Sequence, residues 1–155
     1  MRSNGRAFQP RTQEKRSSNW ESRNAGRGRL QHEVIRKNAE GKTDLRERTK
    51  TFALRVVRMF SALPKTTEAQ VLGKQLLRSG TSIGANYREA FRARSKAEFI
   101  AKCGDSLREI EESAYWLELL MESGVVSAEK LAPLRRECEE LTAIFVTVLK
   151  RVKTS

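Results

Sequence analysis

The segment SKAEFIAKCGDSLREIEESAYWLELLMESG, residues 95–124, decides the fold of this chain. Its apolar side chains recur at alternating steps of four and three residues, the spacing of one face of an α-helix. They are Phe99, Cys103, Leu107, Ile110, Ala114, Leu117 and Met121. Ser95 and Glu98 are spaced as a capping box, and Gly124 is typical of the residue that follows a helix. The segment therefore predicts one long amphipathic helix over residues 95–123.

A similar apolar period occurs three more times and predicts three further helices, over residues 44–63, 67–92 and 127–152. The expected N-caps are Asp44, Thr67 (in a capping box with Gln70) and Ser127, and Pro133 is expected to kink or delay the last helix. An average step of 3.5 residues is typical of helices packed at a shallow angle, and short connections make neighbours antiparallel. We therefore predict an all-α, antiparallel up-down-up-down four-helix bundle over residues 44–155.

Residues 1–43 differ in composition from the rest of the chain. They carry 11 Lys/Arg against 4 Asp/Glu, whereas residues 44–155 carry 20 against 15. With few large apolar side chains and no sustained period, residues 1–43 are predicted to be a disordered basic tail. The stretch RNAGRGRL at 23–30 resembles Arg/Gly-rich tails that interact with RNA. The alternative interpretation of this segment is a solvated leader, or an extension upstream of the true start.

The apolar runs of the sequence are short. None is long enough for a transmembrane helix, and the N-terminus lacks the apolar stretch of a secretory signal. We therefore expect a cytoplasmic protein without a membrane-spanning segment. The net charge of +12 supports attraction to polyanions without indicating a fold.

The residues for catalysis or metal binding are missing from the predicted bundle. The single histidine, His32, lies in the basic tail, and the sequence has no phosphate loop and no Cys-x-x-Cys pair. Glu109, Glu111 and Glu112 could form a carboxylate site, but a solvated or partner-facing surface is the favoured interpretation. Cys103 and Cys138 lie on apolar helix faces at different heights, which predicts reduced core thiols. We expect no enzymatic activity, no metal and no cofactor.

The segment RSGTSIGANYREAF, residues 78–91, is unusual for a bundle helix. Each glycine inside a helix costs about 1 kcal/mol relative to alanine, so Gly80 and Gly84 need a packing or functional reason. Ser79, Ser82, Asn86 and Glu89 form a polar stripe beside the apolar one. One interpretation is a recognition or subunit-contact surface; the other is close helix packing with the hydrogen bonds satisfied inside the bundle. The sequence favours neither.

Two sets of residues are candidates for binding. The basic candidates for nucleic-acid binding are Arg78, Arg88, Arg92, Arg94 and Lys96. The candidates for an oligomer or partner contact are Ser79, Ser82, Gly84, Asn86, Glu89, Tyr115 and Trp116. Tyr115 and Trp116 are included because they lie off the main apolar face of their helix, and aromatic patches of this kind mark partner interfaces.

Two stretches resemble a known family. QLLRSGTSIGANYREA, residues 75–90, and RSKAEFIAKCGDSLREIEESAYWLELL, residues 94–120, resemble the four-helix bundle proteins encoded in 23S rRNA intervening sequences. The resemblance covers about residues 45–150 and does not extend to residues 1–43. The matching hallmark residues are Arg78, Ser79, Ser82, Ile83, Gly84, Asn86, Glu89, Ser95, Lys96, Phe99, Glu112, Tyr115, Trp116 and Leu117.

This resemblance implies a small antiparallel bundle that assembles as a ring-like homopentamer and has no assigned enzymatic activity. The sequence is also similar to the accessory variability determinant proteins of diversity-generating retroelements, which bind a reverse transcriptase and bind nucleic acid through basic surfaces. By this analogy, a reverse transcriptase and RNA or DNA are the expected partners.

Two hypotheses for the function follow. In the first, which the sequence favours, the chain is a non-enzymatic, homo-oligomeric accessory protein that binds RNA or DNA, with an affinity that falls steeply with salt. In the second, the chain is a protein–protein scaffold whose polar stripe and Trp116 patch contact other subunits or a protein partner. Nucleic-acid affinity would then be weak and confined to the tail.

Overall fold

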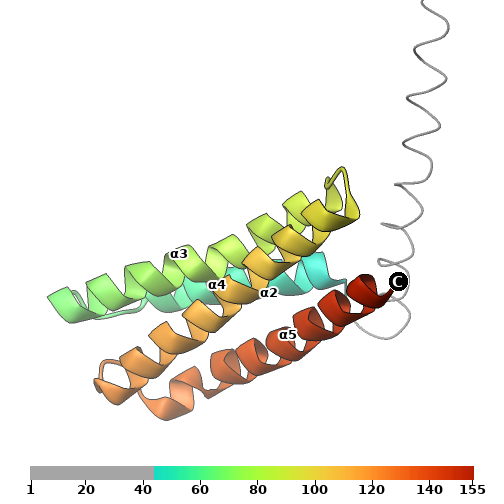
Figure 1. The fold of residues 1–155 in the computed structure, drawn as a ribbon. Coiled ribbons are helices and arrows are strands. Elements are labelled where there is room, and N and C mark those ends of the chain that lie inside the picture. Colours follow the sequence, from blue (N-terminus) through green and yellow to red (C-terminus); the bar gives the residue numbers. More distant parts are fainter. Residues whose placement is uncertain (1–43) are drawn as a thin grey trace, which may run out of the picture.

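The computed structural model describes residues 44–155, which form four α-helices and no strand (Figure 1). The helices are α2 (Leu45–Ser61), α3 (Thr67–Phe91), α4 (Lys96–Glu122) and α5 (Ala128–Thr154). Each helix packs mainly on its neighbours in the sequence, whereas α2 and α5 make sparse contact. The predicted all-α four-helix bundle is therefore confirmed. The predicted disordered tail, residues 1–43, lies outside the described residues.

Three of the predicted N-caps are present. The Asp44 carboxylate accepts a hydrogen bond from the backbone N–H of Arg46 (3.0 Å), and Ser127 Oγ accepts one from Lys130 (3.4 Å). Ser95 Oγ accepts one from Glu98 (3.1 Å). Gly124 follows α4 with a φ of 76°, a left-handed conformation that favours glycine. These local signals fix where α2, α4 and α5 begin and where α4 ends.

The predicted capping box at Thr67 is wrong by one residue. Thr66 is the N-cap, because its backbone is extended and its hydroxyl accepts a hydrogen bond from the N–H of Ala69 (3.4 Å). The side chain of Gln70 instead donates to the carbonyl of Pro64 (2.9 Å), so it ties α3 to the preceding connection. Two adjacent threonines can each serve as an N-cap, so the sequence does not distinguish Thr66 from Thr67. The hydrogen bond from Gln70 to Pro64 also cannot be predicted from residue spacing. Pro133 does not delay α5, which runs without a break from Ala128.

The core is built from the apolar faces that the sequence period defines. Tyr87 lies at its centre and makes edge-to-face contacts with Phe91 and Phe145, with ring centroids 5.2 Å and 5.4 Å apart. Cys103 and Cys138 are buried and free, as predicted. Burial raises the pKa of each thiol to about 12, so both remain protonated at neutral pH.

The glycines of α3 allow α2 to approach closely. A Cβ atom at Gly80 would lie 3.1 Å from a methyl carbon of Val56, and one at Gly84 would lie 3.1 Å from the hydroxyl oxygen of Thr49. Val56 and Thr49 are both fully buried. The two glycines therefore have a packing reason for their place inside the helix.

An ion-paired arginine joins the two helices that otherwise make sparse contact. Arg48 of α2 donates to the carboxylate of Glu137 on α5 (2.6 Å) and also pairs with Glu140. The hydrogen bond to Glu137 is the main reason that the pKa of Arg48 is raised. Among residues 44–155, no helix is both long enough and apolar enough to cross a membrane.

Candidate nucleic-acid interface

The polar stripe of α3 divides into a buried and an accessible part. Ser79 is fully buried, and its hydroxyl oxygen lies 2.9 Å from that of Ser113 on α4. One turn further along, Ser106 of α4 donates to the carbonyl of Ile83 (3.0 Å). With Gly84 packed on α2, the structure favours close helix packing with internal hydrogen bonds for Ser79 and Gly84. Neither residue is accessible to a second subunit in the folded bundle.

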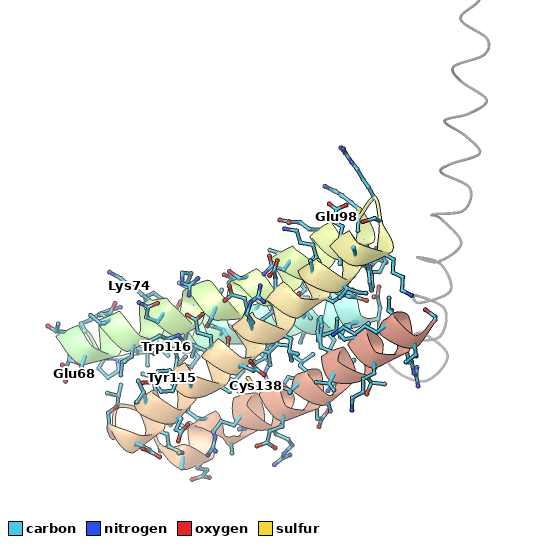
Figure 2. The ribbon with its side chains drawn as sticks, in the orientation of Figure 1. Glu68, Lys74, Glu98, Tyr115, Trp116 and Cys138 are labelled. Carbon is cyan, nitrogen blue, oxygen red and sulfur yellow. The ribbon has the colours of Figure 1, made fainter. Side chains whose placement is uncertain are left out.

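The rest of the stripe, Ser82, Asn86 and Glu89, is partly or fully exposed at the surface of the bundle. Ser82 and Asn86 are half-buried, and Glu89 pairs with Lys102 of α4. On α4, Tyr115 is 51% exposed and its ring centroid lies 5.0 Å from that of Trp116. Figure 2 shows both aromatic side chains far from the connection between α3 and α4, near which Glu98 is labelled.

Arg78 belongs to this surface and not with the other basic candidates. It forms an ion pair with Glu112 of α4 and lies 3.9 Å from a carboxylate oxygen of Glu109. Glu112 also accepts a hydrogen bond from Trp116 Nε1 (3.2 Å). The hydrogen bond to Glu112 raises the pKa of Arg78, so the guanidinium stays charged and is held in an ion pair within the chain.

Glu109 is the least satisfied of these carboxylates. Its Oε2 is buried without a hydrogen-bond partner among the described residues. Burial raises the pKa of Glu109, and the positive charge of Arg78 opposes that effect. Glu109 and Glu112 together hold Arg78 against α4, so a phosphate would have to compete with two carboxylates for this guanidinium.

The other four basic candidates gather at one end of the bundle. At this end α2 begins, α3 ends, α4 begins and α5 ends (Figure 1). We call it the basic end and define it by seven exposed residues: Arg88, Arg92, Arg94, Lys96, Lys150, Arg151 and Lys153. Within residues 44–155 none of the seven forms an ion pair. Arg88 donates a hydrogen bond to the carbonyl of Gly84 (3.4 Å) and its charge acts on Asp44, whereas the other six side chains form no hydrogen bond or ion pair with the described residues and can meet an anion.

The acidic residues of the same end are already engaged. Asp44 binds Arg46, Glu47 binds Lys50, and Glu89 binds Lys102. Glu98 accepts a hydrogen bond from the backbone N–H of Arg94 (2.6 Å). None of these four carboxylates forms an ion pair with one of the seven cations.

The charge of the bundle is divided unevenly along its axis. The segments that meet at the basic end, residues 44–52, 84–104 and 146–155, carry 11 Lys/Arg and 4 Asp/Glu. The remainder of residues 44–155 carries 9 Lys/Arg and 11 Asp/Glu. The excess positive charge of the bundle is thus confined to one end.

Three members of the basic end were not among the residues predicted from the sequence: Lys150, Arg151 and Lys153. They close α5, whose last turn lies at the same end as the connection between α3 and α4 (Figure 1). The predicted antiparallel topology could have identified them, because it places the C-terminus of the fourth helix beside the end of the second.

Within residues 44–155, no group of three or more His, Cys, Asp or Glu side chains is arranged to hold a metal ion. The fold and the charge together define a small helical bundle with one basic end and one outer aromatic patch.

Comparison with known proteins gives the family. The model of the 23S rRNA-intervening sequence protein family matches residues 42–147, and the chain belongs to this family. A solved structure is similar as well, that of a protein of unknown function from the S23 ribosomal protein family of Bacteroides thetaiotaomicron VPI-5482. It is 37% identical, with a TM-score of 0.64, and the match covers 68% of this chain and 97% of that one. A search of curated proteins found no match.

Proposed function

We propose that this chain is a non-enzymatic, homo-oligomeric accessory protein that binds RNA through the basic end of its bundle. The observation that carries the proposal is the set of seven exposed cations without ion pairs, at an end whose four acidic residues are already engaged. Phosphates are the ligands that such a surface attracts, since neutralising them releases counterions from the nucleic acid. A reverse transcriptase stays a partner predicted from the resemblance alone.

A charge-neutralising variant of the full chain tests this proposal. The loop variant carries Arg92→Gln, Arg94→Gln and Lys96→Gln, which removes three cations of the basic end and no ion pair of residues 44–155. We expect its affinity for a structured RNA to fall roughly tenfold and the slope of log K against log salt to flatten by about 2. Fluorescence anisotropy across a salt series measures both quantities.

A matched control changes the charge equally at the other end. The control variant carries Lys65→Gln, Lys74→Gln and Lys130→Gln, three exposed lysines without ion pairs in residues 44–155. Figure 2 shows Lys74 at the end opposite Glu98. The control should bind RNA nearly as wild type does. Equal losses of RNA affinity in the two variants would mean that only the net charge of the chain matters. An unchanged RNA affinity in the loop variant would place the binding site outside the basic end.

The exposed aromatic patch supports the homo-oligomeric part of the proposal. Tyr115 is among the four large hydrophobic side chains that residues 44–155 leave exposed, and it lies against Trp116 beside the polar stripe. Covering such a patch with another subunit removes apolar surface from water. The same patch is what the alternative function, a protein–protein scaffold, would use.

Tyr115→Glu tests whether this patch joins subunits. Because Tyr115 is half exposed, the change should leave the helix content intact while placing a charge in the subunit contact. Light scattering should show an oligomer for the wild-type chain and a smaller species for the variant. Thr147→Glu, on an exposed face of α5, is the control and should keep the wild-type mass. A wild-type monomer, or an unchanged mass for Tyr115→Glu, would contradict the proposed contact.

A further inference from the structure

Among residues 44–155, the basic end has no exposed aromatic ring. Phe91 is the aromatic residue nearest its arginines in the sequence, and the Arg46 guanidinium lies over its ring, 4.8 Å from the centroid. Phe91 is also in edge-to-face contact with buried Tyr87. Phe99, after the connection, is buried. The exposed aromatic residue of the described chain, Tyr115, lies elsewhere on α4 (Figure 2).

This absence limits the kind of nucleic acid that the basic end can hold. Proteins that bind single strands combine cations with aromatic rings on which the bases stack, and each stacked base contributes about 1–3 kcal/mol. A double helix keeps its bases stacked on each other, so a protein can bind it through the phosphates alone. Within residues 44–155, the basic end supplies cations for phosphate contacts but no exposed aromatic ring on which a base could stack.

The positions of the seven cations also favour a double-stranded ligand. They form two groups on different parts of the chain: Arg88, Arg92, Arg94 and Lys96 around the connection between α3 and α4, and Lys150, Arg151 and Lys153 at the end of α5. Figure 1 shows these two places separated across the same end of the bundle. A duplex carries about one charge per 1.7 Å of its axis, twice the density of one of its strands, and presents two phosphate backbones.

We propose that the basic end binds the phosphate backbone of a double-stranded nucleic acid, with one group of cations on each backbone and without reading the bases. This inference rests on the proposed function and specifies the ligand of the same site. It requires both groups of cations for duplex binding. It also requires that losing either group weakens duplex binding more than single-strand binding.

The experiment compares three fluorescent probes of equal length on the full chain: an RNA duplex, a DNA duplex and an unstructured single-stranded RNA. The C-terminal variant, Lys150→Gln with Arg151→Gln and Lys153→Gln, is measured beside the loop variant and the control variant. Using variants of the full chain isolates the contribution of the basic end from that of residues 1–43, which are identical in every sample.

We expect the loop variant and the C-terminal variant each to weaken duplex binding by roughly tenfold, and to weaken single-strand binding at least threefold less. The control variant should change neither. Equal or larger losses for the single strand would overturn the duplex inference while leaving the proposed RNA-binding function in place. Wild-type levels of binding to every probe by both variants would overturn the proposed function as well. Similar losses for RNA and DNA duplexes identify the backbone charge as the ligand, and losses confined to the RNA duplex identify its helical form.

Discussion

Tyr87→Ala is expected to lower the free energy of unfolding by about 3–5 kcal/mol, the usual range for removing a large aromatic side chain from a core. Tyr87 is 2% exposed, and its ring lies between those of Phe91 and Phe145. Its removal leaves a cavity and deletes two edge-to-face contacts, one within α3 (Phe91) and one that links α3 to α5 (Phe145). Urea denaturation followed by circular dichroism measures the change.

The second tyrosine of the chain provides the matched comparison. Tyr115→Ala makes the same chemical change on a side chain that is 51% exposed, so the expected loss in a dilute sample is below about 1 kcal/mol. Tyr87→Phe retains the ring and should lose far less than Tyr87→Ala. Similar losses at the two tyrosines would mean that Tyr87 is not the centre of the core.

Gly80→Leu is expected to destabilise the bundle by about 2–3 kcal/mol through overpacking. A single Cβ at this position already lies 3.1, 3.2 and 3.4 Å from three atoms of Val56. Val56 is fully buried and β-branched, so its side chain has little freedom to turn away. The larger side chain must therefore push α2 away from α3. Gly80→Ala should change stability little, because better helix propensity offsets the tighter contact.

A compensating substitution separates this packing argument from a general intolerance of change in α3. Val56→Ala removes the two methyl carbons that lie closest to a Cβ at residue 80, 3.1 and 3.2 Å away. The double variant should therefore recover at least about 1 kcal/mol relative to the sum of the two single changes, as contacting residues do when they share one space. Strict additivity in the double-mutant cycle would refute the assigned contact between these two residues.

The apolar period predicts the fold because it marks the side chains of each helix that must be buried against the other helices. Cys103, Ile110 and Leu117 appear at helical steps in the sequence and are all fully buried in the bundle. The short connections predict which helices are neighbours, since a few residues cannot carry the chain past an adjacent helix. The predicted N-cap of α3 is wrong by one residue: Thr66 caps the helix instead of Thr67, and Gln70 bonds to Pro64 instead of closing a capping box.

The candidate site is less predictable, since a spacing shows the face of a helix but not what covers it. Ser79 and Ser82 belong to the same polar stripe, yet Ser79 is buried against Ser113 and Ser82 is only half-buried. Likewise Arg78 and Arg92 are both basic candidates of the sequence, and only the tertiary structure shows that Arg78 is ion-paired with Glu112 of α4. Arginines that look equivalent in the sequence therefore differ in the structure, because some form ion pairs with carboxylates of a neighbouring helix and others do not.

Both Asp44 and Ser155 lie at the basic end, where α2 begins and α5 finishes (Figure 1). An affinity tag or fluorophore fused after Ser155 would therefore stand beside the surface that it is meant to leave undisturbed. The connection at Pro64 and Lys65 lies at the opposite end and is exposed, so it is the better attachment point for a label or for immobilisation on a sensor. Surface coupling there would also present every bundle with its cations facing the solution.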